Sequence, residues 1–140
     1  MLRALAALPL VVAVGGSAAA LPGIPSYAQP YRTWTKLNSK PIPPRAVDPH
    51  RSTKNVYVSR LPRNGRYPLG TIVVKEGRNR GFVSLIAVMR KTRARAHNGW
   101  VMIEWTRPTR TARFTELARG SICTSCHFRA RPTDYVFTKR

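Results

Sequence analysis

The only two cysteines of this 140-residue chain stand close together near its carboxyl end, and a histidine directly follows the second one. The segment Cys123-Thr124-Ser125-Cys126-His127 is the C-x-x-C-H pattern of covalent haem c attachment. Each thiol can form a thioether with a haem vinyl group, and the imidazole can then bind the iron as an axial ligand. We therefore expect one covalent haem c per chain, attached to Cys123 and Cys126 with iron bound by His127, and a fold that leaves room for a porphyrin beside this segment.

Three other interpretations of the motif use fewer of its side chains. A disulfide between Cys123 and Cys126 would suit an exported protein, but it gives His127 no role. A structural zinc site needs four ligands, and the fourth would have to be His50 or His97, neither of which lies in a supporting motif. A thioredoxin-like redox pair needs a βαβ setting, which the surrounding sequence does not offer.

The first 20 residues have the pattern of an export signal. A positive start with Arg3 precedes the apolar run 4–14, a Gly-Gly-Ser break and an A-x-A cleavage site that ends at Ala20. Eleven apolar residues are too few to span a bilayer as a helix, so we expect cleavage here and a periplasmic or other extracytoplasmic protein. An uncut membrane anchor or a buried helix is the alternative. Export and C-x-x-C-H agree, because haem c is attached outside the cytoplasmic membrane.

The chain is strongly basic. Lysine and arginine total 25 against five acids, which gives a formal net charge of +20. Such a field favours anionic partners, for example an acidic redox protein. The basic residues are scattered and no nucleic-acid-binding motif accompanies them, so we expect no nucleic acid partner. A basic surface that is simply solvated is the alternative, and no second apolar segment is long enough to cross a membrane.

The rest of the chain predicts one strand-rich domain of α+β class, mainly β, with an antiparallel sheet and a few short helices. Alternating or β-branched stretches indicate strands at 55–60, 71–76, 82–89 and 99–105. Proline, glycine and polar stretches indicate loops or turns at 41–49, 62–65, 77–81 and 90–98.

Helical segments are expected before and after these strands in the sequence. Phe114 and Leu117 lie three residues apart and predict a short helix at 111–118 that Gly120 ends, and 121–128 should be helical around the cysteines. We expect 21–30 to be extended and 31–37 to be a helical turn or a strand start. In domain terms, 1–20 is the signal, 21–50 an N-terminal arm with a Pro-rich loop, and 51–140 the haem-binding domain.

Several strings occur in the order and at the spacing of the cytochrome P460 family and its relative, the β-sheet form of cytochrome c′. They are Asn55-Val56-Tyr57-Val58, Gly70-Thr71-Ile72-Val73-Val74-Lys75-Glu76, Gly99-Trp100, the C-x-x-C-H segment and Asp134-Tyr135-Val136-Phe137-Thr138. The chain resembles this family over about residues 31–138. Every c-type cytochrome shares the haem motif, whereas the string Gly-Thr-x-x-Val-Lys-Glu upstream of it is shared by a much narrower group of proteins.

The resemblance implies an antiparallel β-sheet domain, usually a homodimer, with a five-coordinate haem and His127 as the proximal ligand. In the P460 branch a lysine bonds covalently to the porphyrin edge, and the resemblance assigns that lysine to Lys75. That branch oxidises hydroxylamine. The cytochrome c′ branch lacks the crosslink and binds nitric oxide or carbon monoxide behind an apolar distal face. Two hypotheses follow: a P460-type enzyme acting on hydroxylamine or nitric oxide, or a non-catalytic gas-binding or electron-transfer cytochrome.

The strand pattern leaves the direction of Lys75 open. Thr71, Val73 and Lys75 share one face of the strand, and either face could be the inner one. A lysine that faces a haem pocket would lose hydration, which lowers the pKa of its ammonium group and makes the neutral amine a nucleophile. The alternative is an exposed lysine beside Glu76.

The segment that should carry a distal carboxylate departs from the oxidising branch. Residues 82–89 contain no acid, and by spacing Ile86 or Ala87 stands near its place. A family arginine corresponds to Lys54. Glu104 is the best substitute for the missing acid, and an exposed edge carboxylate paired with an arginine is the other interpretation of that residue.

An apolar distal face would admit small neutral diatomic ligands. The candidates to line it are Phe82, Leu85, Ile86, Met89, Trp100 and Met102, and ordinary core packing is the alternative for each. A sixth iron ligand would instead make an electron-transfer cytochrome, and the side chains that could supply it are Met89, Met102, His50 and His97. We rank this six-coordinate arrangement below an open site.

Overall fold

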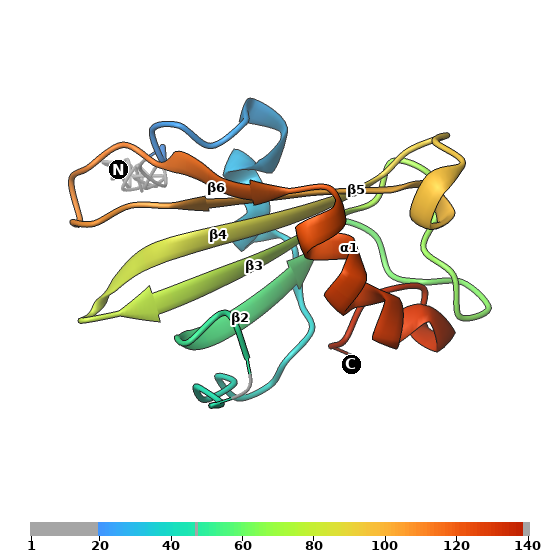
Figure 1. Cartoon of the computed structure of the whole chain (residues 1–140), viewed down its shortest axis with the longest axis horizontal. Coiled ribbons are helices and arrows are strands. Elements are labelled where there is room, and N and C mark those ends of the chain that lie inside the picture. Colours follow the sequence, from blue (N-terminus) through green and yellow to red (C-terminus); the bar gives the residue numbers. More distant parts are fainter. Residues whose placement is uncertain (1–19, 47, 139–140) are drawn as a thin grey trace, which may run out of the picture.

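The computed structural model describes residues 20–138 apart from residue 47. In this part of the chain, six strands form a single antiparallel sheet in which each strand pairs with the next one in sequence (Figure 1). The strands are β1 (Thr35–Lys36), β2 (Thr53–Val58), β3 (Ile72–Asn79), β4 (Phe82–Lys91), β5 (Trp100–Thr106) and β6 (Thr115–Arg119). The predicted fold class, a mainly β domain with an antiparallel sheet, is confirmed.

Short helices cover the two faces of this sheet. The 3-10 helix η1 (Ser26–Thr33) packs on one face, while α1 (Ser121–His127) and the 3-10 helix η3 (Phe128–Thr133) lie on the other (Figure 1). A further 3-10 helix, η2 (Ala96–Gly99), precedes β5. Among the described residues, no helix has the length and apolarity needed to cross a membrane.

The helices on both faces create two apolar cores. Between the sheet and the carboxyl-terminal segment lie Val56, Val58, Val73, Met89, Trp100, Met102, Tyr135 and Val136. Between the sheet and η1 lie Ile24, Ala28, Tyr31, Val74, Val83, Ile86, Val88, Trp105 and Phe114. A sheet buried on both faces needs apolar side chains on both sides of its central strands. This explains why β4 reads as a nearly continuous apolar run.

Two turns contain residues in the left-handed backbone conformation that tight turns require. Arg80 and Gly81 connect β3 to β4 with φ values of 49° and 77°, the left-handed pair of a two-residue hairpin. The loop predicted at 77–81 is therefore shorter, because 77–79 belong to β3. In the predicted turn at 62–65, Asn64 has a φ of 50°, and Arg63 and Arg66 exchange backbone hydrogen bonds across it.

Two helix and coil predictions are wrong. Residues 115–119 form strand β6 against β5 instead of ending a helix. Phe114 is buried in the η1-side core while Leu117 is 58% exposed, so their spacing of three does not mark one apolar helix face. Residues 26–30 belong to η1 instead of an extended chain, because Ala28 and Tyr31 pack against the sheet. The helical turn or strand start expected at 31–37 is confirmed, since η1 continues to Thr33 and β1 follows.

Candidate haem-binding site

Helix α1 places the three side chains of the motif together. It follows Gly120, whose carbonyl accepts hydrogen bonds from the backbone N–H groups of Cys123 and Thr124. Residues three and four apart lie on the same face of a helix, so Cys123, Cys126 and His127 all face one cavity. Both thiols are unpaired and half-buried, and burial is the main reason that the pKa of Cys123 is raised.

The imidazole of His127 is oriented by the segment that follows it. Its Nδ1 lies 2.7 Å from the carbonyl oxygen of Tyr135, so Nδ1–H donates there and the lone pair of Nε2 is left for a metal. Burial lowers the pKa of His127 to about 4, against the opposing effect of the Tyr135 hydrogen bond. The ring is therefore neutral at physiological pH, the form that binds metals.

Asp134 fixes the position of that carbonyl. Asp134 and Tyr135 have φ values of 50° and 67°, an uncommon left-handed pair for residues other than glycine. The Asp134 carboxylate accepts hydrogen bonds from the Tyr67 backbone N–H and from the side chains of Lys91, Asn98 and Trp100. These bonds hold the turn that presents Tyr135 to His127.

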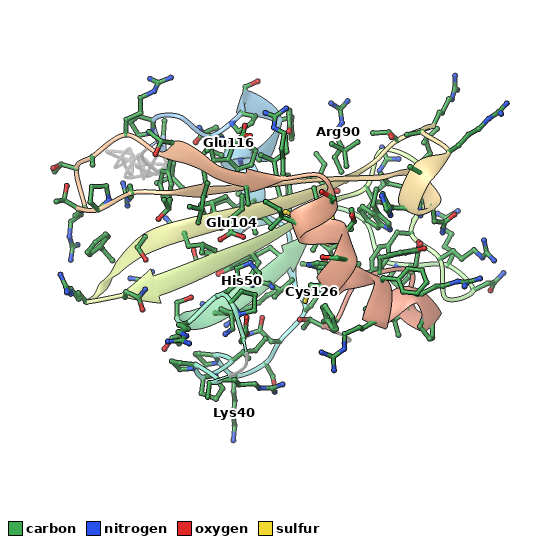
Figure 2. All side chains as sticks on the ribbon, viewed as in Figure 1. Lys40, His50, Arg90, Glu104, Glu116 and Cys126 are labelled. Carbon is green, nitrogen blue, oxygen red and sulfur yellow. The ribbon has the colours of Figure 1, made fainter. Side chains whose placement is uncertain are left out.

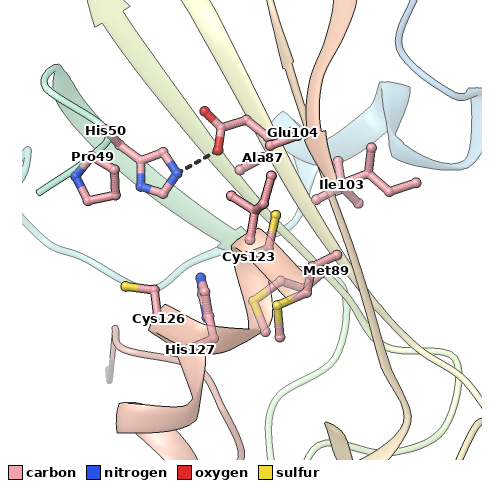
Figure 3. Close-up of a pocket in the computed structure, with 13 residues that line it drawn as sticks. Pro49, His50, Ala87, Met89, Ile103, Glu104, Cys123, Cys126 and His127 are labelled. Carbon is pink, nitrogen blue, oxygen red and sulfur yellow. Dashed lines mark hydrogen bonds and ion pairs between the residues drawn. The ribbon is translucent and has the colours of Figure 1, made fainter. Parts of the chain in front are cut away.

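Two adjoining cavities meet at the motif. One of about 110 Å³ has mainly apolar walls, to which Ala87, Met89 and Met102 contribute. Figure 3 shows Ala87 and Met89 beside Cys123. The other, of about 450 Å³, has a larger polar share in its walls, which include Lys54 and Lys75. Both share Cys126 and His127. Two free thiols, a neutral imidazole and a cavity within the range of cofactor pockets fit a haem c, which Cys123, Cys126 and His127 would hold.

Lys75 faces this site. Direct pairing across β2 to β6 puts Val56, Lys75, Ala87, Glu104 and Ala118 in one row of the sheet. Burial lowers the pKa of Lys75, and the charge of Asp48 opposes the shift. Lys75 lines the larger cavity together with His127. The alternative of a lysine on a solvent face is therefore wrong.

Lys54 belongs to the same wall. It is 2% exposed, and its Nζ lies 2.7 Å from Asp48 Oδ2 and 2.9 Å from the carbonyl oxygen of His50. Both contacts tie the Pro-rich loop to β2. Lys54 thereby holds His50 at the edge of the cavity.

The structure adds a pair that the sequence did not join. Glu104 is 8% exposed, and its Oε2 lies 2.7 Å from His50 Nε2. Figure 2 shows His50, Glu104 and Cys126 beside one another between the sheet and α1, whereas Lys40 extends away from them. The interpretation of Glu104 as an exposed carboxylate paired with an arginine is wrong. The signal that could have indicated its burial is its place between Ile103 and Trp105, two large apolar residues.

Some predicted lining residues lie elsewhere. Ile86 is fully buried in the η1-side core, because neighbouring residues of a strand point to opposite faces and Ala87 takes the side of the haem motif. Phe82 starts β4 near the hairpin turn, under the guanidinium of Arg107. Neither residue reaches the cavity. Met89 and Met102 do line it.

The other candidates are also placed by the structure. The Trp100 indole packs against Tyr67 with ring centroids 5.7 Å apart, and His97 is exposed on η2. Leu85 pairs with Gly77 and Thr106 and does not line either cavity. Of the four candidate sixth ligands, Met89, Met102 and His50 lie at the site.

Comparison with known protein families matches residues 28–138 to Cytochrome P460. No curated protein matches the chain. The matched range contains the whole sheet, Lys75 and the motif helix. The chain therefore belongs to the cytochrome P460 family, and it binds haem.

Proposed function

We propose that this protein is an exported mono-haem c protein of the cytochrome P460 type that acts on hydroxylamine or nitric oxide at an open haem iron. Cys123 and Cys126 form the thioethers, and His127 is the proximal ligand. The observation that carries the proposal is the orientation of His127. Its Nδ1 is engaged by Tyr135, and its ring borders the cavity that the two thiols also line.

The side chains around the cavity have separate roles. The bound haem supplies the redox-active iron and the coordination site at which small nitrogen compounds react. Met89 and Met102, both nearly fully buried, exclude water from one wall and so strengthen electrostatic interactions inside. Tyr135 keeps His127 in one tautomer, which sets the basicity of the proximal ligand.

Lys75 is the residue proposed to crosslink with the porphyrin edge. Its position in the row that faces α1 and the lowering of its pKa by burial favour a neutral, nucleophilic amine. The measurement is to digest the purified holoprotein and weigh the haem peptides. If peptides containing Lys75 never remain attached to the haem, the crosslink does not form.

The first experiment is the optical spectrum of protein matured in a host that attaches haem c. It reports covalent haem, coordination number and porphyrin modification together. Hydroxylamine and an electron acceptor are then supplied without oxygen, and haem-dependent reduction of the acceptor is expected. A colourless protein contradicts the haem c proposal, whereas a haem protein without turnover contradicts only the enzymatic part.

The second candidate function is non-catalytic binding of gases or transfer of electrons, as in the β-sheet cytochromes c′. The observation that favours it is Ala87, which lines the cavity where the oxidising branch of the family carries an acid. Reversible binding of nitric oxide or carbon monoxide without turnover of hydroxylamine would identify this function.

The remaining parts of the proposal concern partners and location. Export rests on residues 1–20, of which 1–19 lie outside the described residues. The formal net charge of the full chain is +20, and cleavage after Ala20 would remove only Arg3 from it. This charge favours an acidic redox partner through long-range attraction. A homodimer is expected from the family. Sedimentation of the holoprotein tests the dimer, and sequencing the amino terminus of the mature protein tests cleavage after Ala20.

A further inference from the structure

We propose that Glu104 accepts the proton of a protic ligand that binds the haem iron, and that His50 positions the Glu104 carboxylate for this step. The proposal rests on the proposed function, because it requires an open coordination site opposite His127. The proton acceptor then lies on β5, in place of the acid that β4 lacks, and the positioning residue lies on the Pro-rich loop.

The geometry places this pair in the cavity of the motif. His50, Glu104, Cys123, Cys126 and His127 line the same 110 Å³ cavity. Figure 3 shows a ring nitrogen of His127 pointing into that cavity, with the His50–Glu104 pair on its other side. A ligand held at iron between them would therefore meet the pair on its distal side.

One carboxylate oxygen remains available for the ligand. Oε2 of Glu104 is engaged by His50 Nε2 at 2.7 Å. Within residues 20–138 other than 47, Oε1 has no hydrogen-bond partner and is not fully buried. A general base must lie within hydrogen-bond reach of the proton that it removes. Glu104 lines the cavity, and its unpaired oxygen can turn toward a ligand there by rotation of the carboxyl group.

The neighbouring charges orient His50. Its Nδ1 lies 3.3 Å from Lys75 Nζ and 3.3 Å from Asp48 Oδ1, and Lys54 neutralises Asp48 at 2.7 Å. When Lys75 donates to Nδ1, the proton of the neutral imidazole is on Nε2 and is donated to Glu104. His50 thus connects the lysine expected at the porphyrin edge with the carboxylate, as a positioning residue.

The sheet explains why the carboxylate comes from β5. Glu104 is directly paired with Ala87 of β4, so its side chain projects from the same row and the same face. The small Ala87 side chain leaves space beside it, and both residues line the cavity. An acid displaced by one strand can thus reach the space that an acid on β4 would occupy.

Binding of hydrogen cyanide to the ferric holoprotein isolates this step from turnover. The H–C bond breaks, its electron pair stays with cyanide as the iron ligand, and the proton moves to Glu104, with no change of oxidation state. Carbon monoxide binding to the ferrous protein is the matched control because it transfers no proton. Both rates are measured by stopped-flow absorption at pH 7.

Replacing Glu104 by Gln should slow cyanide association by about 10²-fold, the lower end of general-base contributions, while carbon monoxide association stays unchanged. His50→Ala should slow cyanide as well, and His50→Gln should slow it less, because the Gln amide can still donate to Glu104. If Glu104 and His50 had a purely structural role, their replacement would change the association rates of cyanide and carbon monoxide alike.

Cyanide association within twofold of wild type in a Glu104→Gln protein that binds carbon monoxide normally would overturn the proposal and leave the haem function intact. The proposal would also be overturned if the wild-type iron bound no carbon monoxide because a sixth ligand such as His50 occupied its open position. If neither Glu104 nor His50 variants mature with haem, wild-type cyanide association is compared in H₂O and D₂O, and equal rates would refute the proton transfer.

Discussion

Removal of the Asp134 carboxylate should destabilise the protein more than any surface substitution. The side chain is 1% exposed and lies 2.8 Å from Lys91 Nζ. It also accepts hydrogen bonds from the Tyr67 N–H at 2.8 Å and from Asn98 Nδ2 at 2.6 Å. Asp134→Ala leaves all these donors without their acceptor.

The magnitude follows from the burial of the pair. Breaking a buried ion pair by removing one partner costs about 3–5 kcal/mol. A buried donor left without an acceptor costs about 1–3 kcal/mol. The costs of the further donors here do not simply add, because they share one carboxylate. We expect a loss of about 4 kcal/mol for Asp134→Ala. Asp134→Asn should lose about 2 kcal/mol, because it keeps one acceptor oxygen but not the charge.

The assay is urea unfolding of the holoprotein followed by far-UV circular dichroism. With a slope of about 2 kcal/mol per M, a loss of 4 kcal/mol moves the midpoint by about 2 M. Glu116→Ala is the control, since the carboxylate there pairs with Arg119 on the surface and the midpoint should barely move. A loss below about 1 kcal/mol for Asp134→Ala would refute the reasoning.

The loss of stability caused by Asp134→Ala should become smaller as the pH falls. Burial alone would raise the pKa of Asp134, but hydrogen bonds from Lys91, Tyr67 and Asn98 hold it below the ordinary value of 3.8. A carboxylate with a lowered folded-state pKa contributes its full stability above the unfolded-state pKa. The gap between wild type and Asp134→Ala is therefore largest above pH 3.8 and shrinks as the pH falls through the folded-state pKa. The same variant should alter the haem spectrum, because Asp134 holds the turn that orients His127 through Tyr135.

Three further predictions concern the crosslink, one turn and the surface charge. Lys75→Ala and Lys75→Arg should both give the optical spectrum of an ordinary haem c, and an unchanged spectrum in either would contradict the crosslink. Gly99→Ala should lower the thermal midpoint more than Gly65→Ala. Both glycines have positive φ values, 84° and 74°, and an alanine held in this conformation costs about 1–2 kcal/mol at either position. Only at Gly99 would the new Cβ also collide with the Thr92 carbonyl. Equal midpoints would argue against that collision. Electron exchange with an acidic redox protein should slow as salt rises, and a rate independent of salt would contradict steering.

Local patterns predicted the parts of the site that are continuous in sequence. The C-x-x-C-H segment forms α1 with both cysteines and His127 on one face, since helical spacing alone brings residues three and four apart together. The strands at 71–76 and 82–89 were also placed correctly, apart from their ends. The helix expected at 111–118 failed because pairing with β5 outweighs a weak helical spacing.

The side of the sheet on which each residue lies could not be predicted in the same way. Strand residues alternate between faces, but both faces here are buried, so hydrophobicity does not distinguish them. This is why Ile86 was expected at the cavity and Ala87 lies there instead. The pairing of His50 with Glu104 joins residues 54 positions apart, a contact that no local pattern contains.

The sequence by itself identified the two thiols and the imidazole that we propose hold the haem, because their spacing is the C-x-x-C-H pattern, and it determined that the domain is a β-sheet. The tertiary structure alone decided which side chains share the cavity with that motif. Strand register and the coverage of both faces turned Lys75 and Glu104 toward α1, while the ion pair between Lys54 and Asp48 brought His50 to meet them. Those contacts arise from packing between distant segments, and their physical cause is the burial of both faces of one sheet.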